Sequence, residues 1–187
     1  VPLWSAAWYP SDHPVSVVDH CHVDGAHVGD DLVAYTQSEW DHPGDVFVAT
    51  RGGAETNRLT RVNSDYLDDR AVCQPEELTV ESDGHEIQAW VMTPPDFDPD
   101  ETYPLAVEVH GGPHAMWSTA GSMWHEFQTL AARGYVVYWS NPRGSTGYGE
   151  EFAQAIERDW GDVTMQDVMA GVERVADRDY VDETNVF

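Results

Sequence analysis

Residues 1–73 contain short runs in which apolar and polar residues partly alternate. Val-rich runs at 15–23, 31–38 and 45–50 alternate in part and are separated by Asp, Gly, His and Pro, which is typical of β-strands joined by turns. The sequence His-Pro-Gly-Asp at 42–45 predicts the turn between the last two runs. Short strands at this spacing predict an all-β segment of the kind found in β-propellers and β-sandwiches.

A polar, irregular stretch at 59–74 separates this segment from the rest of the chain. It has no apolar period, which favours a linker. We therefore expect two domains, residues 1–73 and residues 74–187. The second domain opens with two apolar runs that flank Asp83 and Gly84, a dipeptide that favours a two-residue β-hairpin.

The pattern over residues 103–139 predicts two parallel strands joined by a helix. An apolar strand begins at Tyr103, and residues 123–133 place apolar side chains at helical spacing. Gly134 is placed to end that helix, and a second apolar strand follows at 135–139. This is the unit of an α/β sheet, in which ligands bind where the carboxyl ends of the strands open into loops.

A second helix is expected from Thr164, which is placed to cap it. Asp162 and Asp167 lie near its start, where carboxylates interact favourably with the helix dipole. Neither is expected to be catalytic. Its apolar stripe consists of Met165, Val168, Val172 and Val175. The chain is then expected to turn at 180–184 and to begin another strand at 185–187.

His110, Gly111 and Gly112 follow the strand that begins at Tyr103. Gly111 and Gly112 have no Cβ, so they can adopt unusual backbone angles and leave their N–H groups directed into open space. Fixed donors at such a position are what an acyl-transfer enzyme places opposite the oxygen that becomes negative. The alternative is a simple Gly-Gly-Pro turn after a buried strand.

The loop at 141–149 follows the second strand. Arg143 either borders a substrate cleft or braces the loop against an acidic neighbour, and both interpretations stay open. Ser145 lies in Gly-Ser-Thr-Gly and not in the Gly-x-Ser-x-Gly turn that lifts a nucleophilic serine above a sheet. Three histidines could each act as a general base, but the sequence places no nucleophile beside them. They are His110, His114 and His125.

Residues 19–31 combine side chains that suit zinc. These side chains are His20, Cys21, His22, Asp24 and His27. No second pair of ligands follows, and histidines among acids are ordinary on a solvated acidic loop. We therefore expect no metal site.

The formal net charge is −25, from 34 acidic and nine basic side chains, and every basic one is Arg. Such a surface repels nucleic acid and anionic membranes, which excludes both as expected partners. No apolar run approaches the roughly 20 residues that cross a bilayer, and no secretory signal precedes the first domain. The two cysteines, Cys21 and Cys73, favour reduced thiols in a cytoplasmic protein.

Four stretches, in this order and spacing, resemble the catalytic domain of the prolyl oligopeptidase family of serine peptidases. The resemblance is nearest to the acylaminoacyl-peptidase and dipeptidyl-peptidase-like branch. The stretches are EIQAWVMTPPDFDP at 86–99, YPLAVEVHGGPHAMW at 103–117, LAARGYVVYWSNPRGSTGYGEEFAQAI at 130–156 and DWGDVTMQDVMAGVE at 159–173. The resemblance implies an α/β fold, with the N-terminal half of an α/β-hydrolase domain after the end of a β-propeller.

The resemblance also implies a reaction, the hydrolysis of short peptides through an acyl-enzyme on serine, without a cofactor. It implies oxyanion donors at Gly111 or Gly112, with His110 standing where some relatives have a tyrosine, and it places His110 and Arg143 near the substrate. No Gly-x-Ser-x-Gly occurs in the 187 residues. In the family this turn follows the strand expected at 185–187, so the chain is expected to be a fragment without the catalytic Ser, Asp and His.

Two alternatives to a peptidase remain. One is an esterase or lipase on the same fold, because one fold hosts many chemistries. The other is a non-catalytic remnant that self-associates through the unpaired edge of an unfinished sheet.

The excess of acidic side chains predicts a dependence on salt, as in proteins from a salt-saturated cytoplasm. Repulsion among 34 carboxylates destabilises the fold at low ionic strength, and salt screens that repulsion. We predict that the free energy of unfolding of the 187-residue chain rises between low salt and molar KCl. Urea unfolding followed by tryptophan fluorescence measures this, and an unchanged midpoint would contradict the prediction.

Overall fold

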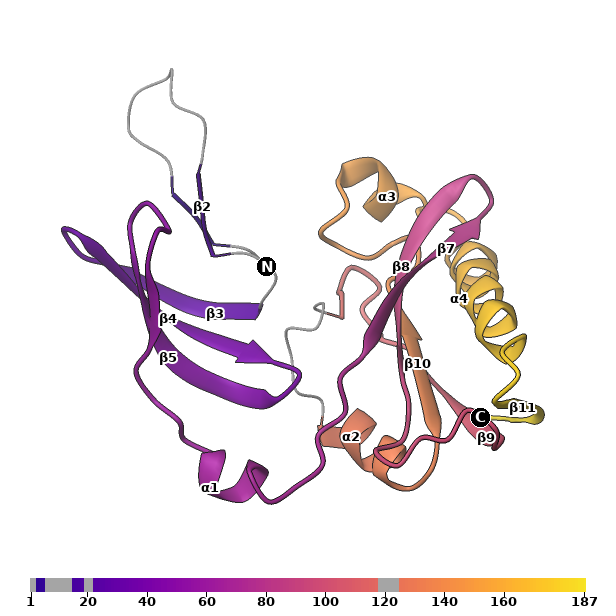
Figure 1. The fold of residues 1–187 in the computed structure, drawn as a ribbon. Coiled ribbons are helices and arrows are strands. Elements are labelled where there is room, and N and C mark those ends of the chain that lie inside the picture. The colour runs from indigo at the N-terminus through magenta and orange to yellow at the C-terminus, as the bar shows by residue number, and fades with distance from the viewer. Residues whose placement is uncertain (1–2, 6–14, 19–21, 118–124) are drawn as a thin grey trace. The chain divides into compact units, whose positions relative to one another are not determined.

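The computed structural model describes residues 3–5, 15–18, 22–117 and 125–187 (Figure 1). The described residues fall into two compact units, unit 1 up to Val72 and unit 2 from Cys73. Within these ranges, no helix has the length and apolar character needed to cross a bilayer.

Unit 1 consists almost entirely of antiparallel β-structure. A small sheet pairs β1 (Leu3–Ser5) with β2 (Val15–Val18). A four-stranded sheet follows, with its strands adjacent in chain order: β3 (His22–Val28), β4 (Leu32–Glu39), β5 (His42–Thr50) and β6 (Thr56–Arg58). One short helix, α1 (Ser64–Leu67), comes after these strands.

The core of unit 1 comes from alternate positions of β4 and β5. Val33 and Tyr35 on β4 are buried, as are Phe47 and Ala49 on β5. The rings of Tyr35 and Phe47 stack with their centroids 5.8 Å apart, and Val17 packs against the same cluster. This is the period of two that a sheet with one buried face produces.

The hairpin between β4 and β5 turns earlier than the sequence predicted. Glu39 pairs with His42, so residues 40 and 41 form the turn and the prediction of a turn at 42–45 is wrong. Pro43 lies within β5 instead, where the pairing register shifts in a bulge. A proline has no N–H to donate to a ladder, and a bulge makes that donor unnecessary.

Strand β3 lies in a segment that is expected from the sequence to be a solvated loop. It pairs with β4 from His22, opposite Ser38, to Val28, opposite Val33. Residues 24–28 are exposed, so they carry no apolar alternation that could have revealed the strand. Backbone pairing, which does not depend on side-chain type, produces it.

Asp45 holds the end of this sheet together. Its buried carboxylate accepts hydrogen bonds from the Arg58 side chain, the Thr60 hydroxyl and the N–H of Val62, the last at 2.9 Å. Burial alone would raise the pKa of Asp45, but the bonds from Thr60, Val62 and Arg58 together outweigh it and hold the pKa below its usual value. The carboxylate thereby ties the chain after β6 to β5.

Unit 2 contains a mixed five-stranded sheet in the order β11-β9-β10-β8-β7. The strands are β7 (Glu76–Ser82), β8 (His85–Met92), β9 (Tyr103–Glu108), β10 (Val136–Ser140) and β11 (Val181–Val186). β9 runs parallel to β10 and β11, whereas β8 is antiparallel to β7 and β10. The predicted hairpin at Asp83 and Gly84 is confirmed, with φ of 50° and 77° at its two turn residues.

Helices cover both faces of this sheet, as an α/β fold requires (Figure 1). They are α2 (His125–Ala132) on one face and α4 (Trp160–Ala176) on the other, and the short helix α3 (Glu150–Gln154) precedes α4. On β10, Val136 and Tyr138 face the cluster that includes α4, whereas Val137 and Trp139 face the cluster that includes α2. All four are buried, so β10 is the centre of the unit.

Two boundaries in unit 2 differ from the prediction. α4 begins at Trp160, so Thr164 lies inside the helix and does not cap it. β11 begins at Val181, within the segment that was expected to turn, and its pairing with β9 shifts register between Asp182 and Val186. Trp160, Gly161 and Asp162 at the start of α4 are exposed, whereas Val181 at the start of β11 is buried in the core of unit 2.

Gly171 is the place where α4 comes nearest to the sheet. A Cβ at this position would lie 1.6 Å from the hydroxyl oxygen of Tyr138, and Tyr138 is fully buried. We predict that Gly171→Ala lowers the free energy of unfolding by about 1–3 kcal/mol through overpacking. Gly161→Ala, in the same helix with no atom within 4 Å, should instead raise it by up to about 1 kcal/mol. Urea unfolding in molar KCl compares the two, and equal effects would contradict this packing.

Candidate active site

Two loops meet at one edge of the unit 2 sheet. Residues 109–117 follow β9, and residues 141–149 follow β10. Because β9 and β10 are parallel neighbours, their carboxyl ends open at the same edge. The loops touch directly, since the N–H of Thr146 donates to the carbonyl oxygen of Ala115 at 2.9 Å.

The loop after β9 presents two free backbone donors. Gly111 and Gly112 are exposed, and neither N–H has a hydrogen-bond partner among the described residues. Gly112 has a φ of 145°, and a Cβ there would lie 2.9 Å from the Cβ of Ala115, so this position requires glycine. At Gly111 a Cβ would meet nothing within 4 Å. Free N–H groups on a shaped loop are the donors that an oxyanion site needs.

Asn141 holds the far end of this loop. Its side chain is fully buried, accepts from the N–H of Trp117 at 2.8 Å and donates to the carbonyl oxygen of Trp117 at 2.9 Å. The same amide lies 2.7 Å from the hydroxyl of Tyr148. The only sign of this role in the sequence is the position of Asn141, a polar residue directly after an apolar strand.

Arg143 forms a buried ion pair with Asp167 of α4. Nε and Nη2 of Arg143 donate to the Asp167 carboxylate at 2.7–3.1 Å, and Nη1 donates to Asp83 at 3.1 Å. Asp167 is fully buried and also accepts from the Arg143 N–H and from the Ser82 hydroxyl. Hydrogen bonding to Asp167 raises the pKa of Arg143 against the opposing effect of burial. This matches the interpretation in which Arg143 braces its loop.

The expectation for Asp167 is therefore corrected. It was placed at the helix start as a carboxylate that favours the dipole, but α4 begins seven residues earlier and buries it. Sequence alone could not show which acid pairs with Arg143, because the two residues lie 24 positions apart.

Ser145 and His110 form a second contact between the loops. Nε2 of His110 lies 3.0 Å from Oγ of Ser145, which the sequence did not predict. Ser145 is only 1% exposed, and its Oγ also lies 2.7 Å from the carbonyl oxygen of Pro142. A hydroxyl buried in this way cannot reach a substrate carbonyl, so the pair does not form a catalytic dyad.

The other two histidines considered as general bases are His114 and His125. Nδ1 of His114 lies 3.0 Å from the carbonyl oxygen of Gly144, which adds a further contact between the two loops. His125 begins α2, and its side chain lies outside the described residues. The ring of Trp117 packs edge-on against His110, with centroids 5.8 Å apart.

Burial raises the pKa of two groups beside the loops. Burial, followed by repulsion from Glu126, raises the pKa of Glu108, the last residue of β9. Burial also raises the pKa of Tyr148, whose hydroxyl accepts a hydrogen bond from Asn141 and donates one to Gln88.

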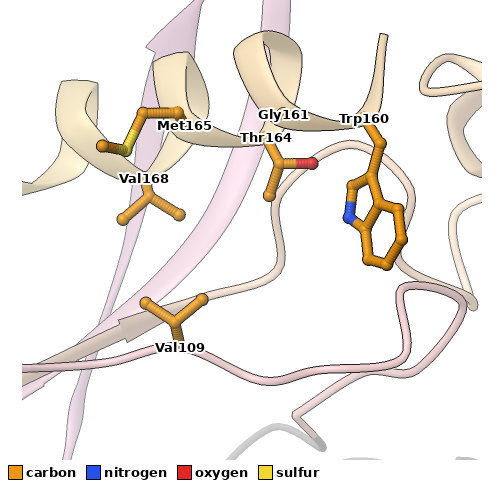
Figure 2. A pocket seen from close by; sticks show the side chains of 6 residues that line it. All are labelled: Val109, Trp160, Gly161, Thr164, Met165 and Val168. Atoms are coloured by element: carbon orange, nitrogen blue, oxygen red, sulfur yellow. The ribbon is translucent and has the colours of Figure 1, made fainter. Parts of the chain in front are cut away.

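An apolar groove lies next to the loop after β9 (Figure 2). Its volume is about 390 Å³, and it is lined by Val109, Trp160, Gly161, Thr164, Met165 and Val168. Figure 2 shows Val109, the residue before His110, facing the side chains of α4. Val109 and Trp160 are 54% and 58% exposed, which is high for apolar residues that line one groove.

The potential metal ligands of residues 19–31 are only partly described. His20 and Cys21 lie outside the described residues. Nε2 of His22 lies 3.6 Å from the Asp24 carboxylate. Among the described residues, the group with ligand atoms close enough for one ion is a different one, formed by Glu39, Asp41 and His42.

We predict that breaking the buried ion pair destabilises unit 2 far more than breaking an exposed one. Arg143→Ala leaves the buried Asp167 carboxylate without its cation and should cost about 3–5 kcal/mol. Arg178→Ala breaks a pair with Glu76, whose side chain is 58% exposed, and should cost about 1 kcal/mol or less. Urea unfolding in molar KCl measures both variants. Equal losses would argue against the bracing role.

Comparison with known proteins gives a consistent result. Residues 121–187 match the model of the prolyl oligopeptidase family. The chain is 41% identical over 128 residues to "Uncharacterized peptidase YuxL" of Bacillus subtilis, covering 68% of this chain and 19% of that protein. It is 45% identical over 98 residues to "Probable dipeptidyl-peptidase 5" of Emericella nidulans, covering 52% and 14%. The chain therefore spans less than a fifth of the length of these relatives.

Solved structures resemble nearly the whole chain. An acylaminoacyl peptidase in complex with Z-Gly-Gly-Phe-chloromethyl ketone matches with a TM-score of 0.84 and 25% identity, over 96% of this chain and 28% of that one. Pyrococcus horikoshii acylaminoacyl peptidase matches with a TM-score of 0.83 and 25% identity, over 96% and 28%. The sequence motifs, the sheet and these matches agree: residues 121–187 match the prolyl oligopeptidase family, and the chain is similar to peptidases of this family.

Proposed function

We propose that unit 2 is the front half of the catalytic domain of a serine peptidase and that its loop at Gly111 and Gly112 supplies half of the oxyanion hole. The observation that carries this proposal is the pair of N–H groups at the carboxyl end of β9 that have no partner among the described residues, in a chain similar to peptidases of this family. The nucleophile would come from a residue outside these 187, because no Gly-x-Ser-x-Gly occurs in them.

The chemistry follows from the charge that develops during acyl transfer. When a serine attacks a peptide carbonyl, the carbonyl oxygen becomes negative, and N–H groups already directed at it stabilise that charge. One such donor contributes about 3–4 kcal/mol to transition-state stabilisation. The loop after β9 would supply one donor, and the residue after the nucleophile would supply the other.

Short peptides are the proposed substrates. The relatives named dipeptidyl-peptidase 5 and the solved acylaminoacyl peptidases support this class, since both names describe enzymes that act near a peptide terminus. The apolar groove beside Val109 offers a surface that suits an uncharged side chain (Figure 2). Arg143 is proposed to act through its loop, because its guanidinium is buried against Asp167.

We propose that unit 1 is the end of a β-propeller. The antiparallel strands β3 to β6, adjacent in chain order, have the form of one four-stranded blade. The structural similarity to the acylaminoacyl peptidase extends over 96% of the chain, so it includes unit 1. The charge of −25 without lysine supports a cytoplasm of high salt as the place where this peptidase works.

The 187-residue chain should form no acyl-enzyme by itself. We predict no covalent labelling by a fluorophosphonate probe and no hydrolysis of a peptide anilide in molar KCl, because Ser145 is buried and the required elbow is missing from the sequence. Mass spectrometry of the treated protein measures the label. Labelling that disappears in Ser145→Ala would overturn the proposal and identify Ser145 as a nucleophile.

One observation favours self-association as a second role. β11 is the last strand in the order of the sheet, so one of its edges has no partner strand among the described residues. Val186 and Phe187 at its end are 39% and 71% exposed. Size-exclusion chromatography of the same preparation examines this role, and a compact monomer at all concentrations would argue against it.

A further inference from the structure

Three potential metal ligands lie at the hairpin between β4 and β5. Glu39 is the last residue of β4, His42 is the first residue of β5, and Asp41 lies in the turn between them. Glu39 pairs with His42 across the hairpin, and paired residues project from the same face of a sheet. Each of the three residues offers one ligand atom, and these atoms all lie within 4.8 Å of one another. The turn thus gathers two carboxylates and an imidazole around one point.

The imidazole of His42 is buried without a hydrogen bond. The residue is only 5% exposed, and Nδ1 has no partner among the described residues. Nε2 lies 3.9 Å from Oδ1 of Asp41, which is too long for a hydrogen bond. Buried polar side chains are almost always paired, so this ring needs a partner that the neighbouring side chains do not supply. An ion held between the ring and the two carboxylates supplies it.

The spacing of the ligand atoms suits a small divalent ion. Ligand atoms about 2.1 Å from a tetrahedral Zn²⁺ lie about 3.4 Å apart, and the separation of 3.9 Å between His42 and Asp41 is about 0.5 Å longer. The side chain of Asp41 is 47% exposed, so it can turn toward an ion without displacing its neighbours. The Glu39 carboxylate accepts a hydrogen bond from Nε2 of Gln37. Carboxylates that bind metals are commonly oriented by such a bond.

A polar cavity borders this group of ligands. Its volume is about 150 Å³, and Asp41 and His42 line it together with side chains from residues 58–68. Three protein ligands leave one position of a tetrahedral ion for water, and a cavity of this size can hold that water.

The charges around the cavity permit a cation. Arg58 lines the cavity, but its guanidinium is already paired with the buried carboxylate of Asp45. Arg61 is exposed and shares the cavity with Asp68. With Glu39 and Asp41 added, four carboxylates face two guanidiniums. A divalent ion therefore relieves an excess of negative charge.

The ligand types select the class of ion. An imidazole nitrogen combined with carboxylate oxygens suits Zn²⁺ and other divalent transition metals. Ca²⁺ takes about six to eight oxygen ligands, and Mg²⁺ prefers an octahedron of oxygens, which this group does not provide. We propose that Glu39, Asp41 and His42 bind a divalent transition-metal ion of the class of Zn²⁺, which ties the turn between β4 and β5 together. The site does not depend on the proposed function, because no step of acyl transfer uses these residues.

The test titrates Zn²⁺ into the 187-residue chain in molar KCl and follows the amide NMR signals of residues 37–42. We expect saturable shifts at one ion per chain. Asp41→Asn and Glu39→Gln keep the size of each side chain and should weaken binding at least about 100-fold, because each loses a charged ligand. Asp24→Asn is the matched control. It alters the neighbouring pair of His22 and Asp24 and should leave the affinity unchanged.

Two further measurements identify the ligand and the class of ion. The imidazole ¹⁵N signals of His42 should shift as Zn²⁺ binds, whereas a histidine with only a packing role would keep its signals. Ca²⁺ and Mg²⁺ should cause no saturable shift at residues 37–42.

Three results would overturn the proposal. The first is a wild-type chain without saturable Zn²⁺ shifts at residues 37–42, including the case in which the ion shifts only residues 19–31. The second is an unchanged affinity in Asp41→Asn and Glu39→Gln while the amide signals of β4 and β5 confirm an intact sheet. The third is Ca²⁺ binding at these residues as tightly as Zn²⁺.

Discussion

The buried carboxylate of Asp167 is the constraint from which the candidate site is built. A fully buried charge is stable only when it is paired and hydrogen-bonded, and Asp167 meets that condition through Arg143 and Ser82. Asp167 lies on α4, and its two partners lie on the loop after β10 and at the end of β7, so the contacts join three separate elements. The ion pair therefore fixes the start of the 141–149 loop relative to the sheet.

Fixing that loop has effects at the neighbouring one. Asn141 holds the backbone of Trp117 at one end of the loop after β9, and Ser145 holds the His110 ring at the other. The Gly-Gly segment lies between these supports and has no side chains of its own to fix it. Its two supports, Asn141 and Ser145, belong to the loop that Arg143 ties to Asp167.

Local patterns were sufficient for much of the fold. The Asp83-Gly84 turn, the β9 and β10 strands and the helix before Gly134 were all predicted, because turn chemistry and apolar periodicity act over a few residues. The predictions of secondary structure failed where the local sequence pattern is weak or ambiguous. β3 is mostly exposed and shows no alternation, and Pro43 looks like part of a turn although it lies in a bulge of β5.

The sequence by itself determined the fold class, the two loops at the ends of β9 and β10, and the place of the two glycines in the first of these loops. It could do so because backbone freedom and apolar period belong to single residues and short segments. Only the tertiary structure decided which acid pairs with Arg143, that Ser145 is buried, and that His110 bridges the loops. Those contacts join residues 24 to 35 positions apart, and no local rule selects one partner among 34 acids.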